Sequence, residues 1–383
     1  MFSDLRPSLY GENRHPSGLV YHHRPIMSHP LPIFTPPGLT PPPRASTQRR
    51  LIDSHGRTIR DLRLGVTDRC NFRCVYCMDP DVRFLRKSQL MTLPEMVRVA
   101  RICVDLGVRK IRLTGGEPTI YPHLDDLIGQ LSRLPIDDLA MTTNGSLFDL
   151  DRARLWKRLG LRRLTLSLDT LREDRFTSIT RSSTTPAKVI ASITAARDAG
   201  LRPVRVNAVI VRGRNEDEIL DLVALARELD IEMRFIEYMP LDSARAWDRD
   251  KMVSAREILD IIESRYPLRA IGRQGASGTS LNHEFADGSP GGVGIIASVT
   301  RVFCSRCSRL RITADAQVRP CLFSTEEFDL RSLMREGGGG VGGASDRAIE
   351  DFLMDATWTK QRGHSINEAT YVQPTRPMSS IGG

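Results

Sequence analysis

The chain has 383 residues, of which 40% are hydrophobic and 26% charged, a balance typical of globular proteins that excludes a largely disordered or membrane-embedded chain. No apolar run approaches the roughly 18 residues that a transmembrane helix needs, so we expect a soluble, cytoplasmic protein with no membrane partner. The net charge of +9 at pH 7 suits an anionic small molecule as well as a nucleic acid.

The first 50 residues differ in composition from the rest of the chain. They contain six arginines and ten of the 23 prolines against two acidic residues, and they show no sustained periodicity. We therefore predict a disordered extension over residues 1–50. This segment supplies +4 of the net charge, and the remainder is spread over 333 residues, which weakens a nucleic-acid interpretation.

From residue 61 onward, β-like runs alternate with helical patterns. We predict strands at residues 62–67, 110–114, 139–143, 163–168, 204–211 and 232–237. Helical spacing predicts helices at residues 94–106, 121–134, 150–159, 186–199 and 216–229. Strands interleaved with helices predict an α/β fold with a parallel sheet and right-handed crossovers. The pattern alone fits an open doubly wound sheet and a partial barrel equally well.

Chemically distinctive segments follow the strands at their carboxyl ends, where ligands gather in both of these folds. Cys70 follows the first strand, and the motifs GGEP, TTNG, SLD and EYMP follow the second, third, fourth and sixth. After Pro240 the alternation stops, and a Gly- and Ser-rich stretch over residues 272–294 leads into a second unit. We therefore predict one domain over residues 51–240 and a C-terminal domain over residues 241–383.

The seven cysteines fit metal-ligand sets in a reducing compartment better than disulfides, because their number is odd and they are clustered. Cys103 lies at helical spacing with apolar neighbours, which indicates a core residue. The others form two groups of three: Cys70, Cys74 and Cys77, and Cys304, Cys307 and Cys321. A structural zinc site needs four ligands, whereas three thiolates on a cubane of four irons leave one iron open.

The CxxxCxxC loop after the first strand, together with GGEP after the second, resembles the radical S-adenosylmethionine (SAM) superfamily. The resemblance implies a partial (β/α)6 barrel of the TIM type and a [4Fe-4S] cluster on the first trio, whose open iron chelates SAM. One-electron reduction of SAM then yields a 5′-deoxyadenosyl radical, chemistry that belongs to the cofactor. By position, the resemblance implies SAM contacts from Tyr76, Gly116, Ser167 and Met239.

Basic residues on the predicted strands indicate an anionic ligand. Arg309 and Arg311 lie two apart on one arm of a predicted hairpin (residues 309–313 and 317–319), so both point to one face beside the second trio. Arg63 and Arg112 lie on strands expected to be buried, where an unpaired charge is costly. A bound polyanion would offset that cost, because guanidinium groups match phosphate oxygens in pairs.

Longer motifs together resemble the GTP 3′,8-cyclase family of molybdenum cofactor biosynthesis: LRLGVTDRCNFRCVYCM, KIRLTGGEPT, MTTNG, RFIEYMP, CSRCSRLRITAD, KQRGHSIN and the terminal RPMSSIGG. The resemblance covers about residues 53–383 and implies a C-terminal α+β unit with a second [4Fe-4S] cluster on Cys304, Cys307 and Cys321. GTP would lie between the clusters. The radical would remove the ribose 3′ hydrogen, and the sugar carbon would attack C8 of guanine to give (8S)-3′,8-cyclo-7,8-dihydroguanosine 5′-triphosphate.

The same resemblance assigns further roles by position. The family's GTP contacts fall on Arg63, Arg112, Thr143, Arg205, Arg309, Leu310 and Arg311. Gly382 and Gly383 correspond to a tail that threads into the active site, so we expect them to act in catalysis. The resemblance also implies an external one-electron reductant of the flavodoxin kind and a downstream cyclic pyranopterin monophosphate synthase, allows a homodimer, and gives no role to nucleic acid.

The chain departs from the family pattern at four places. Arg205 stands where the family usually has Lys, Ser308 where Asn is common, and Ala316 where Gly is common in the hairpin turn, and residues 337–343 look like a flexible insertion. An alanine held at positive φ in that turn would cost about 1 kcal/mol.

Two other functions stay open on the sequence. A radical SAM peptide-modifying maturase with an auxiliary cluster shares both cysteine groups in principle. A zinc-bearing nucleic-acid-binding protein would fit the sequence pI of about 9.4, with His283 or His364 completing the second trio. The arginines beside that trio favour a nucleotide.

Overall fold

Six parallel strands at the centre of the fold follow one another in chain order. The computed structural model describes residues 49–242, 245–275, 278–336 and 343–382, so nearly all of the predicted extension and of the glycine-rich insertion lies outside the described residues. The strands are β1 (Asp61–Gly65), β2 (Lys110–Thr114), β3 (Asp138–Thr143), β4 (Arg163–Ser167), β5 (Arg205–Ile210) and β6 (Glu232–Glu237). Each end lies within two residues of the predicted run.

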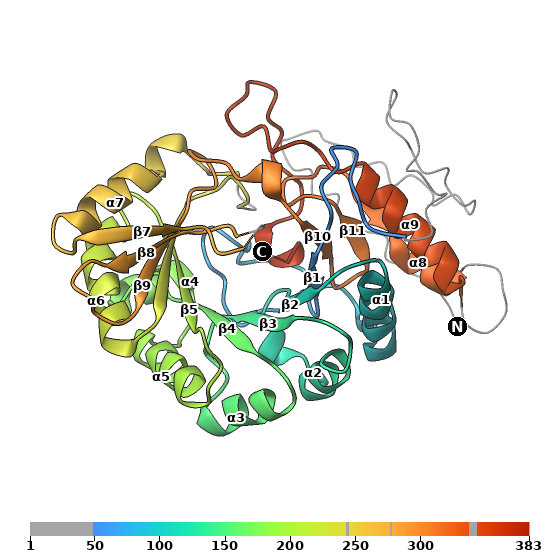
Figure 1. The fold of residues 1–383 in the computed structure, drawn as a ribbon, viewed down its shortest axis with the longest axis horizontal. Helices are drawn as coiled ribbons and strands as arrows, with labels where there is room; N and C mark the ends of the chain where they lie inside the picture. The colour runs from blue at the N-terminus through green and yellow to red at the C-terminus, as the bar shows by residue number, and fades with distance from the viewer. Residues whose placement is uncertain (1–48, 243–244, 276–277, 337–342, 383) are drawn as a thin grey trace, which may run out of the picture. The chain divides into compact units, whose positions relative to one another are not determined.

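The order of these strands decides between the two predicted architectures. Within a twelve-stranded sheet, β1 to β6 are neighbours in sequence order and pair in parallel. A doubly wound sheet would reverse its order at an inner strand, whereas successive neighbours curve into a barrel, as Figure 1 shows. β7 and β12 stand at opposite ends of the sheet order, so the barrel is partial.

Helices cover the outer face of this curved sheet (Figure 1). The predicted helices correspond to α1 (Leu93–Asp105), α2 (Leu124–Leu131), α3 (Leu150–Arg158), α5 (Pro186–Asp198) and α6 (Ile219–Leu229). At the start of α1, the Thr92 side chain accepts from Glu95 N, and the Glu95 side chain accepts from Thr92 N, which satisfies two helix N–H groups. The predicted helix at residues 121–134 was too long at both ends, because α2 begins after His123 and ends before Ser132. In the predicted helix at residues 216–229, the first three residues form a separate short 3-10 helix.

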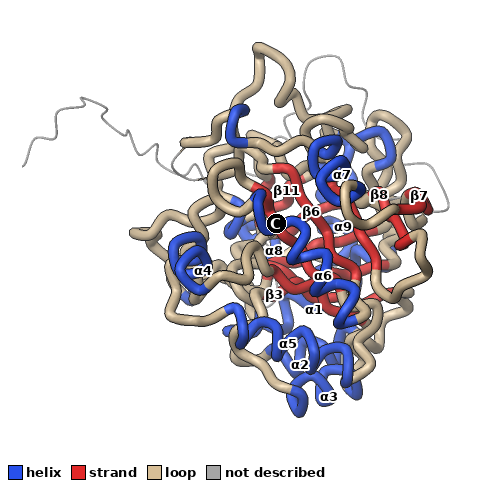
Figure 2. Tube along the Cα trace, turned by 90° about the vertical axis from the view of Figure 1, so that its left-hand side faces the viewer, coloured by secondary structure: helices blue, strands red, loops and turns tan. Residues whose placement is uncertain are grey.

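The sequence pattern missed α4 (Glu173–Thr180), a short helix after β4 in which the buried apolar residues are Phe176 and Ile179. Seen from the side, α4 lies apart from α2, α3 and α5 (Figure 2). The carbonyls of Ile179 and Thr180 accept from Val75 N at 3.0 Å and Arg73 N at 2.8 Å. α4 therefore supports the first cysteine loop.

The C-terminal region extends the barrel sheet at both edges. Beyond β6 lie β9 (Gly292–Ile296), β8 (Leu281–Phe285) and β7 (Leu268–Gly272), and beyond β1 lie β10 (Arg309–Ile312), β11 (Gln317–Arg319) and β12 (Phe328–Asp329). The region also contributes α7 (Ala255–Glu263), α8 (Leu330–Glu336) and α9 (Asp346–Trp358). The predicted hairpin is confirmed as the antiparallel pair of β10 and β11. The predicted boundary near residue 240 stays a prediction, because one sheet runs through both parts.

The two faces of the barrel strands differ in polarity. Leu62, Leu64, Ile111 and Leu113 belong to the apolar core, whereas the alternate residues of β1 and β2, such as Arg112, line a cavity. Side chains on a strand alternate between faces, so the inner face of this barrel is polar where a closed TIM barrel is packed with branched apolar side chains.

Ala316 lies in the turn between β10 and β11 with a φ of 59° and is buried. The expected left-handed conformation is therefore kept at this position, although the residue is not glycine.

Among the described residues, no helix is long and apolar enough to cross a membrane.

Candidate active site

Both cysteine trios open into one cavity of about 860 Å³ enclosed by the barrel strands and the C-terminal region. The lining includes most of the residues singled out in the sequence: Arg63, Cys70, Cys74, Tyr76, Cys77, Arg112, Gly116, Thr143, Ser167, Arg205, Met239, Cys304, Cys307, Arg309, Arg311 and Cys321. A volume of this size suits a ligand as large as a nucleotide.

The first cysteine loop is held by packing and by hydrogen bonds. Phe72 packs edge-on against Phe176 of α4, with ring centroids 5.8 Å apart. Cys70 Sγ accepts from Phe72 N at 3.4 Å and from Asn144 Nδ2 at 3.9 Å. Such donors stabilise a thiolate, so the loop is suited to bind a metal cluster.

The GGEP segment packs directly on this loop. Gly116 N and Glu117 N donate to Thr67 O at 2.8 Å and Arg69 O at 2.7 Å. A Cβ at Gly116 would lie 2.1 Å from Arg69 O, so a side chain there would displace the backbone. The two glycines of GGEP are therefore required for contact between two backbone segments.

Glu117 joins three of the loops that follow the strands. Its buried carboxylate accepts from Thr143 Oγ1 at 2.7 Å and from Asn144 N at 2.7 Å. Burial raises the pKa of Glu117, although these hydrogen bonds oppose the rise. Thr143, predicted as a GTP contact, thus directs its hydroxyl to Glu117.

Tyr76 is oriented by a buried carboxylate. Its Oη donates to Asp169 Oδ2 at 2.5 Å, and Asp169 Oδ1 accepts from Val209 N at 2.8 Å. Burial raises the pKa of Asp169 to about 6. The SLD motif had marked this position without a role; the structure places Asp169 where it fixes the ring of Tyr76 against the cavity.

The two trios differ in electrostatic surroundings. Burial raises the pKa of Cys70 to about 11 and that of Cys77 to about 12. Burial also raises the pKa of Cys307, but the charges of Arg309 and Lys360 outweigh it and lower the value to about 6. Three thiolates at the first trio would therefore need a positive charge beside them, such as that of a metal, whereas nearby side-chain cations already favour the thiolate of Cys307.

Two cations that sequence reasoning did not assign hold the second trio in place. Arg57 donates to Cys304 O at 2.6 Å and to Gln361 O at 2.6 Å, and Asp53 Oδ2 accepts from Arg57 Nε at 2.6 Å. The buried Lys360 donates to Arg309 O at 2.9 Å and to Pro320 O. The signal for Lys360 was present in the motif KQRGHSIN, but its partners are remote in sequence.

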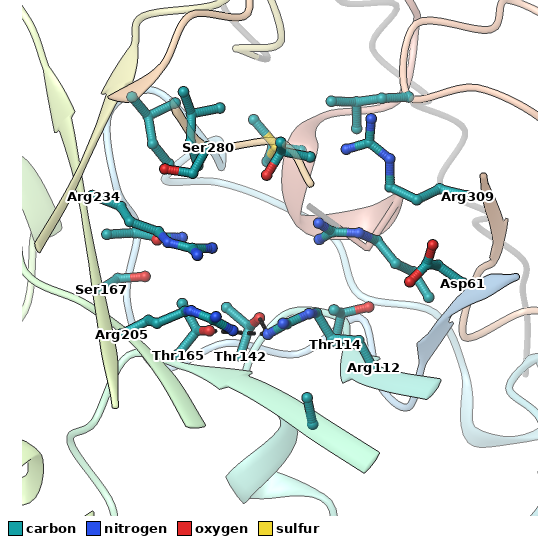
Figure 3. Close-up of a pocket in the computed structure, with 18 of the residues that line it drawn as sticks. Asp61, Arg112, Thr114, Thr142, Thr165, Ser167, Arg205, Arg234, Ser280 and Arg309 are labelled. Atoms are coloured by element: carbon teal, nitrogen blue, oxygen red, sulfur yellow. Dashed lines mark hydrogen bonds between the residues drawn. The ribbon is translucent and has the colours of Figure 1, made fainter. Parts of the chain in front are cut away.

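The inner face carries more positive charge than its partners neutralise. Among the described residues, Arg112 donates only to the hydroxyls of Thr142 at 3.1 Å and Thr165 at 3.0 Å. Figure 3 shows these contacts, with Arg205, Arg234 and Arg309 around the same space. Burial and, to a smaller extent, the charges of neighbouring arginines together lower the pKa of Arg63, Arg112 and Arg311, the last to about 9. All three stay cationic at neutral pH, so an anion in the cavity would relieve their repulsion.

Arg205, Leu310 and Gly382 differ from the other predicted site residues in how they meet the cavity. Arg205 is paired with Glu232 at 3.1 Å and donates to Gln274 Oε1 at 3.1 Å. The Leu310 side chain packs in the apolar core, which leaves its backbone to meet a ligand. Gly382 O accepts from Arg311 Nη1 at 2.8 Å, so the tail reaches the cavity arginines; Gly383 lies outside the described residues.

Within the described part of the chain, no group of three or more His, Cys, Asp and Glu side chains is arranged to hold a single metal ion. His364 Nε2 lies 2.7 Å from Ser298 O. A cubane accepts each thiolate on a different iron, so its ligands need not converge on one point.

Comparison with protein families defines the class. The radical SAM superfamily model matches residues 64–226, and the Molybdenum Cofactor Synthesis C model matches residues 231–366. The fold resembles Streptococcus suis SuiB (TM-score 0.53, 18% identity, 79% of this chain and 67% of that chain) and SuiB bound to precursor peptide SuiA (TM-score 0.58, 15% identity, 80% and 67%). The fold and the site therefore define a radical SAM enzyme.

More similar relatives define the family. A GTP 3′,8-cyclase of Streptomyces coelicolor is 45% identical over 87% of this chain and 96% of the relative. That of Mycolicibacterium smegmatis is 41% identical over 87% and 92%, and GTP 3′,8-cyclase 2 of Mycobacterium tuberculosis is 41% identical over 90% and 96%. The chain belongs to the GTP 3′,8-cyclase family, radical SAM lyases of molybdenum cofactor biosynthesis. The likeness to SuiB, at 18% identity or less, shows the fold alone and does not support the peptide-modifying alternative.

Replacing Gly116 with Ala should displace the first cysteine loop, because the new Cβ would lie 2.1 Å from Arg69 O and such overpacking costs about 1–3 kcal/mol. We expect the free energy of unfolding to fall and iron bound after anaerobic reconstitution to drop by roughly half, as for the loss of one of two clusters. Gly129→Ala is the matched control, since its Cβ would meet only Leu159 Cδ2 at 3.7 Å inside a helix. Normal iron binding by Gly116→Ala would contradict the prediction.

Replacing Asp169 with Asn should change how stability depends on pH. The folded protein holds the Asp169 proton up to a pKa of about 6, against an ordinary value of 3.8. Its contribution to stability is therefore present below pH 3.8 and lost as pH rises through 6, a decrease of about 2–3 kcal/mol at roughly 1.4 kcal/mol per pH unit. Denaturant unfolding of the metal-free protein between pH 4 and 7 should show a shallower decline for the variant; parallel curves would refute this assignment.

Proposed function

We propose that this chain converts GTP to (8S)-3′,8-cyclo-7,8-dihydroguanosine 5′-triphosphate, the first step of molybdenum cofactor biosynthesis. The observation that carries the proposal is a single cavity that joins both cysteine trios and is lined by arginines with too few carboxylate partners. A triphosphate supplies the missing negative charge, and its oxygens match guanidinium forks.

The cysteines are proposed to hold two [4Fe-4S] clusters. Cys70, Cys74 and Cys77 would bind the cluster that carries SAM, and Cys304, Cys307 and Cys321 a second cluster beside the guanine. When bound, the first cluster and SAM supply the one-electron radical chemistry. Tyr76, Gly116, Ser167 and Met239, which all line the cavity, are proposed to position SAM.

The arginines are proposed to position GTP. Arg63 is the strongest candidate for a phosphate contact, because no described group hydrogen-bonds its guanidinium, so a ligand need not displace a protein partner. Arg112, Arg309 and Arg311 surround the same space, and Arg205 joins them by exchanging Gln274 for a phosphate oxygen. Thr143 and the Leu310 backbone complete the proposed set. Holding the sugar close to SAM, away from water, favours transfer of one hydrogen atom over quenching.

The tail glycines are proposed to act in the cyclisation step. Gly382 has a φ of +69°, and a Cβ there would lie 2.7 Å from Thr114 Oγ1, so this position accepts only glycine without strain. Its carbonyl meets Arg311, one of the proposed phosphate ligands. The remaining parts of the proposal are a cytoplasmic flavodoxin-like reductant and a cyclic pyranopterin monophosphate synthase that consumes the product.

Anaerobic turnover tests the proposed reaction. Reconstituted protein with dithionite and SAM should form 5′-deoxyadenosine and a cyclised nucleotide with GTP but not with ATP, CTP or UTP. GTP carrying deuterium at the ribose 3′ position should yield deuterated 5′-deoxyadenosine, measured by mass spectrometry. Arg63→Gln should raise KM for GTP by about tenfold or more, since a charge-assisted phosphate contact contributes about 1.5–3 kcal/mol. GTP-independent 5′-deoxyadenosine without cyclised product would refute the reaction.

Removing Gly382 and Gly383 tests the role of the tail separately from that of the other site residues. We expect cyclised product to be lost while iron content and reductive cleavage of SAM stay close to wild type, because the cysteines and proposed SAM contacts are untouched. Adding two alanines in place of the glycines should not restore the product, given the close approach of Thr114. Wild-type yield of cyclised product after the truncation would rule out a role for the glycines.

A further inference from the structure

The last residues of the chain lie between the two cysteine loops. Ser379 Oγ donates to Cys77 O at 3.4 Å, Ile381 is buried with Leu241 and Phe323 in a separate apolar cluster, and Gly382 O accepts from Arg311. Chain ends fray unless they are tied down, so the contacts that hold this segment bear on where Gly382 lies.

Arg376, six residues before Gly382, makes the ionic contacts at the start of the tail. Its two terminal nitrogens bind both oxygens of Asp315, at 2.9 and 2.8 Å. Its Nε contacts Glu327 Oε2 at 2.8 Å. Each of the three guanidinium nitrogens thus contacts a carboxylate oxygen, in a planar arrangement that a lysine cannot reproduce.

The two carboxylates belong to the segment that carries the second trio. Asp315 lies in the turn between β10 and β11, and Glu327 lies just before β12. Glu327 also pairs with Arg319, which is fully buried and two residues before Cys321. β10 itself supplies Arg309 and Arg311 to the cavity. The contacts of Arg376 therefore tie the tail to the same hairpin that presents the cavity arginines.

We propose that Arg376 is a positioning residue for the cyclisation step, which acts by clamping the tail to Asp315 and Glu327 so that Gly382 meets Arg311. The inference rests on the proposed function of the tail glycines. The same clamp accounts for the strained Ala316 turn: Asp315 precedes Ala316, whose φ is 59°, and this turn directs the Asp315 carboxylate to Arg376.

The clamp is suited to fixing position because its members are only partly exposed. The exposed fractions of the side chains are 26% for Arg376, 9% for Asp315 and 20% for Glu327. Salt screens such a pair less than a surface pair. Thr313 Oγ1 also donates to Asp315 Oδ1 at 2.5 Å, so the hairpin itself orients the carboxylate that Arg376 binds.

The test compares Arg376→Ala, Arg376→Lys and Asp315→Asn with the matched control Arg335→Ala. Arg335 also binds both oxygens of one carboxylate, Glu95, at 2.7 and 2.9 Å, with a side chain 32% exposed, but its partners belong to residues 88–95 and not to the hairpin of β10 and β11. We expect the rate at which cyclised product forms to fall on the order of 10²-fold in Arg376→Ala, as it does when reacting groups are misplaced. SAM cleavage should continue, so the ratio of 5′-deoxyadenosine to product rises, and Arg335→Ala should keep the wild-type ratio.

Two further measurements separate positioning from general stability. In the metal-free protein, amide exchange at Ile381 and Gly382 should accelerate about tenfold or more in Arg376→Ala while the barrel amides are unchanged. In the chain that lacks Gly382 and Gly383, Arg376→Ala should add no further loss of product, since both changes act through the tail. Arg376→Lys keeps the charge without the bidentate guanidinium contact. It should fold normally and still show a raised ratio of 5′-deoxyadenosine to cyclised product.

The outcomes distinguish this inference from the proposed function. A wild-type chain that forms no cyclised nucleotide would refute the function itself. If the wild type cyclises GTP and Arg376→Lys and Asp315→Asn keep the wild-type ratio of 5′-deoxyadenosine to product, the clamp has no positioning role. Equal acceleration of amide exchange in the barrel and in the tail would show that Arg376 acts through general stability, which also overturns the inference.

Discussion

The structure depends on one electrostatic constraint: arginines that point into the barrel interior without enough carboxylates to neutralise them. Arg63, Arg112 and Arg311 have lowered pKa values because they are buried near one another. Such an arrangement costs stability in the free protein. It persists because the strands that bear these residues are held from the other face by a continuous apolar core, and an anionic ligand turns the cost into binding energy.

The same constraint explains how the C-terminal region is used. β10 pairs in parallel with β1, in a register that places Arg309 beside Asp61 and Arg311 beside Arg63. The region thus adds its arginines to the barrel's own and brings the second trio to the same cavity. Arg57 and Lys360 then fix the second trio through backbone carbonyls, and Lys360 also lines the cavity.

At the first trio, close contacts between backbone segments position the cysteine loop. GGEP is glycine-rich because its backbone meets residues 67–69 at distances that exclude a side chain, and Glu117 gathers the loops after β2 and β3 with hydrogen bonds. α4, which has few apolar residues, supplies two carbonyls to the cysteine loop. The periodicity of the sequence could not indicate α4, because the helix is short and its role is to hold a loop.

The sequence by itself determined the parallel strands to within two residues, the two trios, the hairpin of Arg309 and Arg311, and the family, because strand alternation and metal-ligand spacing are local properties. Only the tertiary structure decided that the sheet is a partial barrel extended at both edges, that Leu310 faces the core and that Thr143 bonds Glu117. It also decided the contacts of Asp169 with Tyr76, of Arg57 and Lys360 with the second trio's backbone, and of Arg376 with Asp315. These partners lie far apart in sequence. Their pairing follows from how strands and loops close on one cavity, which no local pattern encodes.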